Sequence, residues 1–254
     1  MSAVDGAVAV VTGASGGVGG AIADALESAG ARVARVSRHA DQFRCDIGFR
    51  DEVDRLKAEV ETELGRPQVL VNAAGIFGPI ALLSESEPER WIETIMVDLI
   101  GPYLSCRAFV PGMIDAGWGR IVNVTSAASL HPPGPTNSAY GTAKTALNQL
   151  TRHLAAELEG TGVTANVIHP GDVKTEMWAD IRSQIAGSGP ETEAYRQWVE
   201  WVEETGGDPP EKAGDLVLRI CEDDVNGKFL WIEDPLQAPI PSWGDEPGTQ
   251  PWRR

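Results

Sequence analysis

Cysteine is scarce in this sequence, and its three cysteines do not stand in a spacing that binds metal ions. Cys45, Cys106 and Cys221 lie far apart, whereas zinc sites draw their ligands from closely spaced pairs. An odd number of scattered cysteines is typical of reduced thiols in the cytoplasm. We therefore expect no metal site, no disulfide framework and a cytoplasmic location.

Basic residues and long hydrophobic runs are scarce as well. The 21 lysines and arginines face 37 aspartates and glutamates, which leaves a net charge of −16. Such a surface repels nucleic acids and anionic membranes, so we expect neither as a partner. The first apolar run, residues 7–11, is too short for a signal peptide or a membrane span, and no basic stretch precedes it.

Short apolar runs alternate with segments of helical periodicity along the chain. Runs without polar alternation suit strands that are buried on both faces of a parallel sheet. They occupy residues 7–11, 31–36, 69–71, 120–124, 163–168 and 228–232. Helical spacing follows at 53–64, 89–113 and 138–159, and Gly101-Pro102 is expected to bend the second of these helices. The pattern predicts an α/β fold with a doubly wound parallel sheet in a single domain.

A glycine-rich turn joins the first apolar run to a first helix that ends at Gly30. Its spacing is Gly13-x-x-x-Gly17-x-Gly19. Glycines let the backbone approach a pyrophosphate, and the start of a helix offers free N–H groups and the positive end of its dipole. The turn therefore indicates a dinucleotide site, and a tight connection without a ligand is the alternative.

The alternating pattern loosens after Pro170. Residues 175–207 have the pattern of two helical pieces around a joint at 187–190, and a further helix is expected from Pro210 to about Ile220. We assign residues 1–233 to one dinucleotide-binding domain that includes the segment 175–207. Residues 234–254 are rich in proline and glycine and are expected to form an irregular tail.

The end of the second apolar run carries a base rather than an acid. Ser37-Arg38-His39 stand where an acidic residue would hydrogen-bond the 2′-hydroxyl of NAD. Arg38 could pair with the 2′-phosphate of NADP, which a carboxylate would repel. We therefore predict NADP as the cofactor, with NAD as the alternative if Arg38 is an ordinary surface charge.

A tyrosine and a lysine stand four residues apart at the start of the long helix 138–159. Tyr140 and Lys144 share one helix face at this spacing. Tyrosine has an ordinary pKa of about 10 and is a poor base near neutrality, but a nearby cation favours its phenolate. Ser126 follows the run 120–124 and could hold a substrate oxygen beside Tyr140. The pair alone would be a surface feature, and its place in the alternating pattern indicates catalysis.

Five motifs together resemble the short-chain dehydrogenase/reductase family over residues 7–177. They are Thr12-Gly13-Ala14-Ser15-Gly16-Gly17-Val18-Gly19, Asn72-Ala73-Ala74-Gly75, Val124-Thr125-Ser126, Tyr140-x-x-x-Lys144 and Asn166-Val167-Ile168-His169-Pro170-Gly171. The resemblance implies a Rossmann-type fold and hydride transfer between a nicotinamide cofactor and an alcohol or ketone. It implies that Tyr140 exchanges a proton with the substrate oxygen and that Ser126 positions that oxygen. Lys144 would lower the pKa of Tyr140 and bind the nicotinamide ribose.

The resemblance also implies a set of cofactor-binding residues. Asp46 is similar to the acid that contacts adenine, and the segment around Pro170 is similar to the one that contacts the nicotinamide amide. The complete set that we expect is Gly13, Ser15, Gly17, Val18, Gly19, Ser37, Arg38, Asp46, Ile47, Asn72, Ala73, Gly75, Tyr140, Lys144, Pro170, Gly171, Val173 and Thr175.

One position departs from the family's pattern. The family usually has an asparagine in the helix after the third strand, in a proton relay near the lysine, and this chain has Asp98. We hypothesise that Asp98 is a fourth catalytic residue in the relay, although its charge would partly neutralise Lys144. The alternative is that Asp98 caps a bend in the helix. His131, in a proline-rich loop, could be a further acid or base but is more simply a solvated residue.

The segment 175–207 falls where the family has its substrate lid. Its Met177, Trp178, Tyr195, Trp198 and Trp201 favour a hydrophobic or ring-bearing substrate, or else only pack the lid onto the body. A dinucleotide sensor without activity and an epimerase or dehydratase remain alternative functions. The helices at 89–113 and 138–159 resemble those that pair subunits in the family, so we expect a homodimer or homotetramer.

Overall fold

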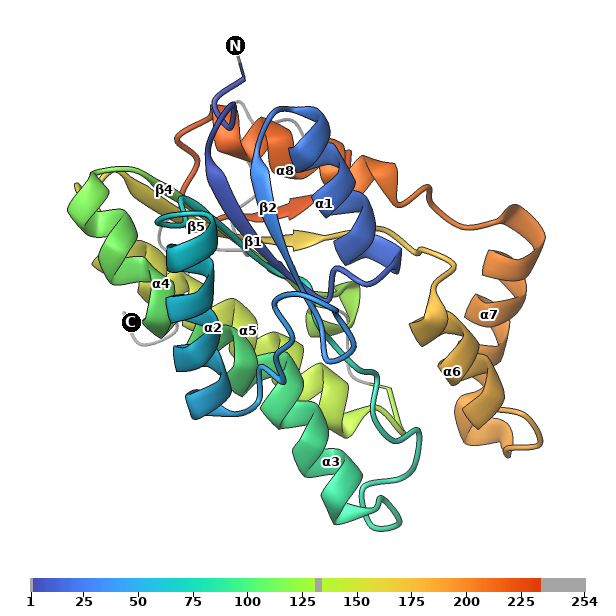
Figure 1. Cartoon of the computed structure of the whole chain (residues 1–254). Coiled ribbons are helices and arrows are strands. Elements are labelled where there is room, and N and C mark those ends of the chain that lie inside the picture. Colours follow the sequence, from blue (N-terminus) through green and yellow to red (C-terminus); the bar gives the residue numbers. More distant parts are fainter. Residues whose placement is uncertain (1, 131–133, 234–254) are drawn as a thin grey trace, which may run out of the picture.

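The computed structural model describes residues 2–130 and 134–233, and six parallel strands form its sheet. The strands run in the order β2-β1-β3-β4-β5-β6 (Figure 1). Their bounds are β1 Val8–Thr12, β2 Arg32–Val36, β3 Val69–Asn72, β4 Gly119–Val124, β5 Val163–His169 and β6 Phe229–Trp231. The predicted α/β fold is confirmed. Because the strand order reverses beside β1, a ligand crevice is expected at the carboxyl ends of the strands there.

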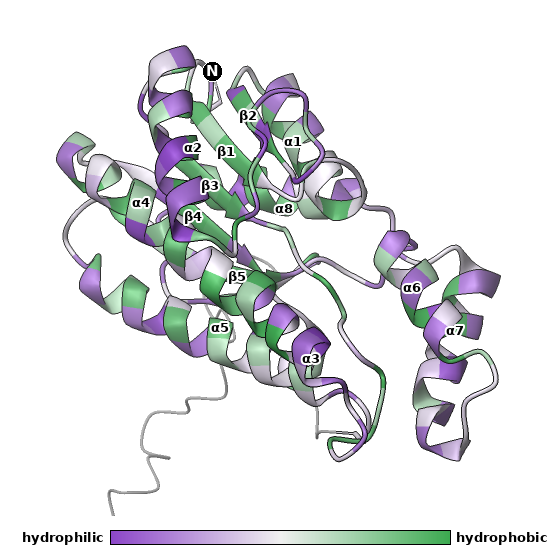
Figure 2. Ribbon diagram, turned by 60° about the horizontal axis from the view of Figure 1, so that its bottom comes forward, coloured by the Kyte–Doolittle hydropathy of each residue, from purple (hydrophilic) through white to green (hydrophobic). Residues whose placement is uncertain are grey.

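Helices cover both faces of this sheet. Figure 1 shows α1 (Gly17–Ser28) beside α8 (Glu211–Glu222), with α2 (Arg50–Glu63), α4 (Gly101–Ala116) and α5 (Ser138–Glu157) on the opposite side. Side chains alternate between the faces along a strand. Accordingly, β1 contributes Val8 and Val10 to one buried apolar cluster and Ala9 and Val11 to the other. Strand β1 is accordingly mostly hydrophobic in Figure 2, whereas much of α2 is hydrophilic.

The segment after β3 forms one continuous helix that contains a single widened turn. It consists of α3 (Pro88–Ile95), the π-helical turn η1 (Met96–Ile100) and α4. In η1 the Gly101 N–H donates to the Met96 carbonyl, five residues back. Pro102 has no N–H to donate to the Asp98 carbonyl, so the α-helical pattern cannot continue through this point. The irregular turn therefore lies one helical turn before the bend that was predicted at Gly101-Pro102, and it includes Asp98.

The chain between β2 and α2 contains no helix. Ser37 pairs with Arg44 in an isolated parallel bridge, and Phe43 turns the chain at a φ of 58°. This bridge brings Asp46 and Ile47 back to the edge of the crevice. Ile47 is 5% exposed and packs so closely on Gly101 that a Cβ there would lie 2.6 Å from its Cδ1.

The lid, residues 175–207, contains the two helical pieces that the sequence predicted. They are α6 (Glu176–Gln184) and α7 (Glu193–Thr205), with the 3-10 turn η3 (Pro190–Thr192) between them. Both helices stand away from the sheet in Figures 1 and 2. The described part of the chain contains no helix that is long and apolar enough to cross a membrane. His131 and the predicted tail, residues 234–254, lie outside the described residues.

Candidate active site

The glycine-rich turn forms a cradle that only glycine permits. A Cβ on Gly19 would lie 2.4 Å from the Gly13 carbonyl oxygen, and one on Gly13 would lie 2.7 Å from the Ala74 Cα. Helix α1 begins at Gly17, and no side chain caps it and no acid stands in its first turn. Its first N–H groups and the positive end of its dipole are therefore available to a phosphate. The turn fits a dinucleotide pyrophosphate for these reasons.

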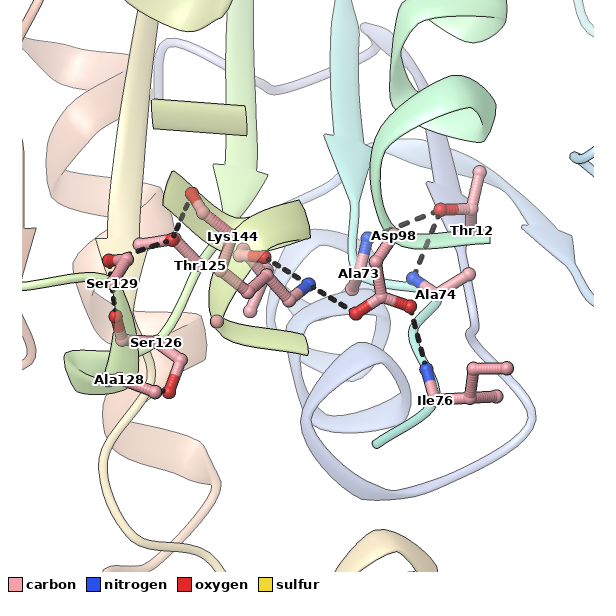
Figure 3. Close-up of polar contacts among 12 residues, drawn as sticks. Thr12, Ala73, Ala74, Ile76, Asp98, Thr125, Ser126, Ala128, Ser129 and Lys144 are labelled. Atoms are coloured by element: carbon pink, nitrogen blue, oxygen red, sulfur yellow. Dashed lines mark hydrogen bonds and ion pairs between the residues drawn. The ribbon is translucent and has the colours of Figure 1, made fainter. Parts of the chain in front are cut away.

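The loop after β3 is fixed against the glycine turn by Thr12, which no sequence pattern singled out as a contact of this loop. The N–H groups of Ala73 and Ala74 both donate to Thr12 Oγ1, at 3.2 Å each (Figure 3). Thr12 is fully buried at the end of β1. Asn72, by contrast, is 1% exposed and donates to Asn123 Oδ1 at 2.8 Å, so its side chain lies between strands. This hydrogen bond joins β3 to β4 next to the crevice.

The residues expected at the adenosine end lie at the edge of the sheet by β2. Arg38 is half-exposed, and its guanidinium is 3.7 Å from the Glu93 carboxylate of α3. Asp46 accepts a hydrogen bond from the Gly48 N–H at 3.0 Å. Ser37 holds its own turn, since its hydroxyl accepts from the His39 N–H at 3.3 Å. Arg38 can therefore turn toward a phosphate, because this movement breaks only an exposed ion pair that contributes little to stability.

Ser126, Tyr140 and Lys144 converge at the carboxyl ends of β4 and β5. Ser126 follows β4 and lines the same cavity as Tyr140, which is 7% exposed on α5, and its hydroxyl lowers the pKa of that tyrosine. Asn137 caps that helix by accepting from the Gly141 N–H at 3.2 Å, and so fixes the turn that carries Tyr140. Lys144 Nζ lies 5.5 Å from the centre of the Tyr140 ring and donates to the Val124 carbonyl at 3.0 Å.

Asp98 lies at the same centre and contacts the lysine directly. Figure 3 shows its carboxylate facing Lys144 on one side and Ile76 on the other. The distance from Oδ2 to Lys144 Nζ is 3.1 Å, and Oδ1 accepts from the Ile76 N–H at 2.8 Å. The side chains of Asp98 and Lys144 are 0% and 5% exposed. A Cβ on Gly75 would contact both charged groups, so glycine leaves room for the pair.

Burial and charge oppose each other in this group. Burial raises the pKa of Tyr140, Lys144 lowers it, and the Asp98 charge raises it again, with a net result above the ordinary value. Burial would lower the pKa of Lys144, but the charges of Asp98 and Tyr140 outweigh that effect and raise it. Burial raises the pKa of Asp98 against the opposing effects of Lys144 and the Ile76 N–H.

A cavity of about 510 Å³ lies between this group and the lid. Its body side includes Ser126, Tyr140 and the predicted cofactor residues Val18, Pro170, Gly171, Val173 and Thr175. Its lid side includes Met177, Trp178, Tyr195 and Trp198, whereas Trp201, which was expected on the inner face as well, is 46% exposed and is not among the lining residues. No cluster of three or more acidic, histidine or cysteine side chains suited to a metal ion occurs among residues 2–130 and 134–233.

Phe77 and His169 also line the cavity, and sequence patterns pointed to neither as a lining residue. The Phe77 ring lies 4.7 Å from the Tyr140 ring and 5.5 Å from the Tyr195 ring. His169 Nδ1 accepts from the Ala127 N–H at 3.3 Å and supports the turn after Ser126. The only signal for Phe77 is its position in the loop after the Asn72 motif, and periodicity does not identify loop residues.

Hydrogen bonds from Gln184 and Trp198 connect the lid to the body. Gln184 of α6 accepts from the Ile80 N–H at 3.1 Å and donates to the Gly78 carbonyl at 3.0 Å. Trp198 of α7 donates from its indole nitrogen to Asp172 Oδ1 at 3.0 Å. These contacts hold the lid over the cavity from both of its helices.

Comparison with known proteins agrees with this geometry. A family described as short chain dehydrogenase matches residues 7–186. The 2,3-dihydro-2,3-dihydroxybenzoate dehydrogenase of Bacillus subtilis (strain 168) is 32% identical over 198 residues, which are 70% of this chain and 75% of that protein.

Two solved structures have the same fold and differ in cofactor. NAD⁺-bound xylitol dehydrogenase aligns with a TM-score of 0.80 and 25% identity over 90% of this chain and 98% of its own. A metagenomic short-chain oxidoreductase in complex with NADP aligns with a TM-score of 0.69 and 31% identity over 87% and 93%. The chain therefore belongs to the short-chain dehydrogenase/reductase family and is an NAD(P)-dependent oxidoreductase that acts on alcohol or ketone substrates.

Proposed function

We propose that the chain transfers a hydride between NADP(H) and a hydrophobic or ring-bearing alcohol or ketone, with Tyr140 as acid and base. The observation that carries this proposal is that Ser126 and Tyr140 line the same cavity, with Lys144 Nζ 5.5 Å from the centre of the phenol ring. A substrate oxygen between the two hydroxyls would meet a proton donor and a second hydrogen-bond donor together.

The four polar side chains have separate tasks in this proposal. In reduction, Tyr140 donates its proton to the substrate oxygen, and Ser126 stabilises the charge that develops there. Lys144 stabilises the tyrosinate that remains, and Asp98 holds Lys144 in place through the 3.1 Å ion pair. Bound NADPH would supply the hydride, which no protein side chain provides. In alcohol oxidation the same residues act in reverse, with Tyr140 as the base.

The cofactor would lie along the carboxyl edge of the sheet. Gly13, Ser15, Gly17, Val18 and Gly19 would hold its pyrophosphate, and Ala73 and Gly75 would border its ribose through their backbone. Asn72 would act only by joining β3 to β4 before that loop, because its side chain is buried and donates to Asn123. Asp46 and Ile47 would border the adenine, and Pro170, Gly171, Val173 and Thr175 the nicotinamide. Gly17 lies close to Thr175, since a Cβ on that glycine would be 3.1 Å from Thr175 Cγ2. This proximity supports the arrangement in which the nicotinamide site follows the pyrophosphate site along the sheet edge.

The preference for NADP rests on Arg38. It is the cation at the end of β2 beside Ser37, and its pair with Glu93 is long and half-exposed. A guanidinium in this position can form two hydrogen bonds to a 2′-phosphate. The test is the ratio of kcat/KM for NADPH to that for NADH, which we expect to exceed about tenfold. Equal values for the two cofactors would refute the preference.

The substrate class follows from the lid side of the cavity. Phe77, Trp178, Tyr195 and Trp198 supply aromatic surface opposite Ser126 and Tyr140. Aromatic walls around a few polar groups favour a ring or an apolar chain next to the reacting oxygen. The 32% identical relative from Bacillus subtilis is named for a substrate with a ring, which is consistent with this proposal.

The activity is tested by following NADPH absorbance with a panel of cyclic, aromatic and aliphatic ketones. Tyr140→Phe should reduce turnover at least about a hundredfold, because general acid catalysis contributes that much or more. Tyr103→Phe is the matched control, since Tyr103 is 46% exposed on α4. Cofactor binding without turnover across the panel would favour a sensor. Interconversion of stereoisomers without net change in NADPH would favour an epimerase.

We also propose a homodimer or homotetramer of single-domain subunits, residues 1–233, in the cytoplasm. Exposed Ile92, Tyr103 and Ile114 on α3 and α4 leave apolar surface that a second copy would cover. The three cysteines are free and buried, as expected for a reducing compartment. Sedimentation of the protein as a monomer at micromolar concentration would contradict the oligomer.

A further inference from the structure

The proposed function leaves open which direction of the reaction the site favours, and the contacts of Asp98 bear on that question. Asp98 is fully buried in η1: its Oδ1 accepts a hydrogen bond, and its Oδ2, which has no hydrogen-bond partner among the described residues, is in an ion pair. Lys144 Nζ is 3.1 Å from one oxygen, and the Ile76 N–H is 2.8 Å from the other. A protonated carboxyl would need an acceptor for its own hydrogen. Two donors instead match the carboxylate, so the pair is ionised.

The ion pair changes what Tyr140 experiences. A lone Lys144 ammonium 5.5 Å from the ring would stabilise the tyrosinate strongly in this buried site. With Asp98 beside it, the ring faces a pair without net charge. We propose that Asp98 is a positioning residue that neutralises Lys144, keeps Tyr140 protonated through and above neutral pH, and so sets the site for carbonyl reduction. This inference rests on the proposed role of Tyr140 as acid and base.

Other charged groups around Tyr140 do not replace this effect. Lys144 lies on the same helix, and Asp98 comes from η1. Burial raises the pKa of Tyr195 of α7 to about 12, so this residue stays neutral. His169, Asp172 and Glu191 share the cavity, but among the charged side chains that the structure describes it is Asp98 that forms an ion pair with Lys144.

Reduction needs the protonated tyrosine at the start of the step. The carbonyl carbon takes the hydride that the reduced nicotinamide supplies, and the carbonyl oxygen takes the Tyr140 proton. The tyrosinate then recovers a proton from solvent. Oxidation needs the tyrosinate first, so any charge that disfavours the tyrosinate moves oxidation to higher pH and leaves reduction active over a wider range.

The first measurement is a titration of the phenolate by its near-ultraviolet absorbance, without substrate or cofactor. The chain has three tyrosines, and Tyr140→Phe identifies the step that belongs to Tyr140. Asp98→Asn keeps the shape and the Ile76 contact but removes the charge. The Asp98 charge acts from beside Lys144, whose Nζ lies 3.1 Å from Oδ2 and 5.5 Å from the ring centre. At an effective dielectric constant of about 20, removal of this charge should lower the pKa of Tyr140 by about one to two pH units.

The second measurement is the pH dependence of kcat/KM in both directions. In Asp98→Asn, the acid limb of alcohol oxidation and the alkaline limb of ketone reduction should both move down by about one to two pH units. Asp115→Asn, which removes an exposed charge from α4, should leave both limbs in place. Circular dichroism checks the fold, and Asp98→Ser serves as a second neutral variant if Asp98→Asn is unstable.

The outcomes separate this inference from the proposed function. A lowered phenolate titration without any turnover would support the role of Asp98 and refute the proposed activity. Unshifted phenolate titration and unshifted limbs in folded Asp98→Asn or Asp98→Ser would overturn the inference, even with full activity. A shift to higher pH would overturn it as well, because it would have the wrong sign for the removal of a negative charge.

Discussion

Gln184 gives a direct test of whether the lid must stay on the body for substrate to bind. Its side-chain amide accepts from the Ile80 N–H at 3.1 Å and donates to the Gly78 carbonyl at 3.0 Å. Its remaining N–H donates to Asp180 at 2.8 Å, which fixes the orientation of the amide. Gln184→Ala removes both bonds to the loop after β3 and leaves the backbone of the lid unchanged.

The size of the effect follows from these two bonds. A neutral hydrogen bond contributes about 0.5–1.5 kcal/mol net, and Gln184 is half-buried, so the two together contribute about 1–2 kcal/mol. That corresponds to a roughly five- to thirtyfold shift between attached and detached lid. If only the attached lid binds substrate, the apparent KM should rise by up to this factor. The kcat at saturation should change little, because bound substrate holds the lid in place.

The assay is steady-state reduction of the best ketone in the panel at saturating NADPH. Ser183→Ala is the matched control, since Ser183 is the preceding residue of α6 and is exposed. An unchanged KM in folded Gln184→Ala would refute the reasoning. So would an equal loss in kcat with no change in KM, which would indicate damage to Ser126 or Tyr140 rather than to the lid.

Three other predictions test the cofactor end, the glycine cradle and the charge of the cavity. Arg38→Gln should lower kcat/KM for NADPH about tenfold and leave NADH nearly unchanged, and Glu93→Gln should shift the ratio the other way; equal losses for both cofactors would contradict this. Gly13→Ala should lower the melting temperature by about 5 °C and weaken NADPH binding, because Gly13 has a φ of 70° and a Cβ there would lie 2.7 Å from the Ala74 Cα. Gly112→Ala should do neither, because a Cβ at Gly112 meets nothing within 4 Å. The described lining of the cavity includes Glu191 and Asp172 but no lysine or arginine, so a ketone with a carboxylate should have a kcat/KM about tenfold below that of its neutral amide; the reverse order would refute this.

Local patterns in the sequence were sufficient for the elements that carry the site. The apolar runs predicted the strands because a parallel strand is buried on both faces, and β1 indeed contributes to both cores. The glycine turn and the Tyr140–Lys144 spacing lie within single elements, so their geometry follows from the chain itself. The two lid helices were recognisable because Gly187–Pro190 interrupts one amphipathic pattern.

Contacts between distant segments could not be predicted in this way. Gln184 bonds to residues more than a hundred positions earlier in the chain, and nothing in its own segment indicates those partners. The π turn at Asp98 depends on the missing N–H of Pro102, which the sequence shows, but its register depends on how α3 and α4 pack. Gly101-Pro102 predicted a bend close to this point, but no pattern in the sequence indicated the distance between Asp98 and Lys144.

The ion pair also determines how variants of Lys144 must be interpreted. Removing Lys144 alone leaves the Asp98 carboxylate fully buried with only the Ile76 N–H as a partner. An unpaired buried charge costs about 3–5 kcal/mol, so Lys144→Met should lose stability as well as activity. The double variant Asp98→Asn/Lys144→Met removes both charges and should regain most of the stability without regaining turnover. Only the turnover that stays lost in the double variant reports the catalytic contribution of Lys144, because in the single variant that contribution is mixed with the cost of the stranded carboxylate.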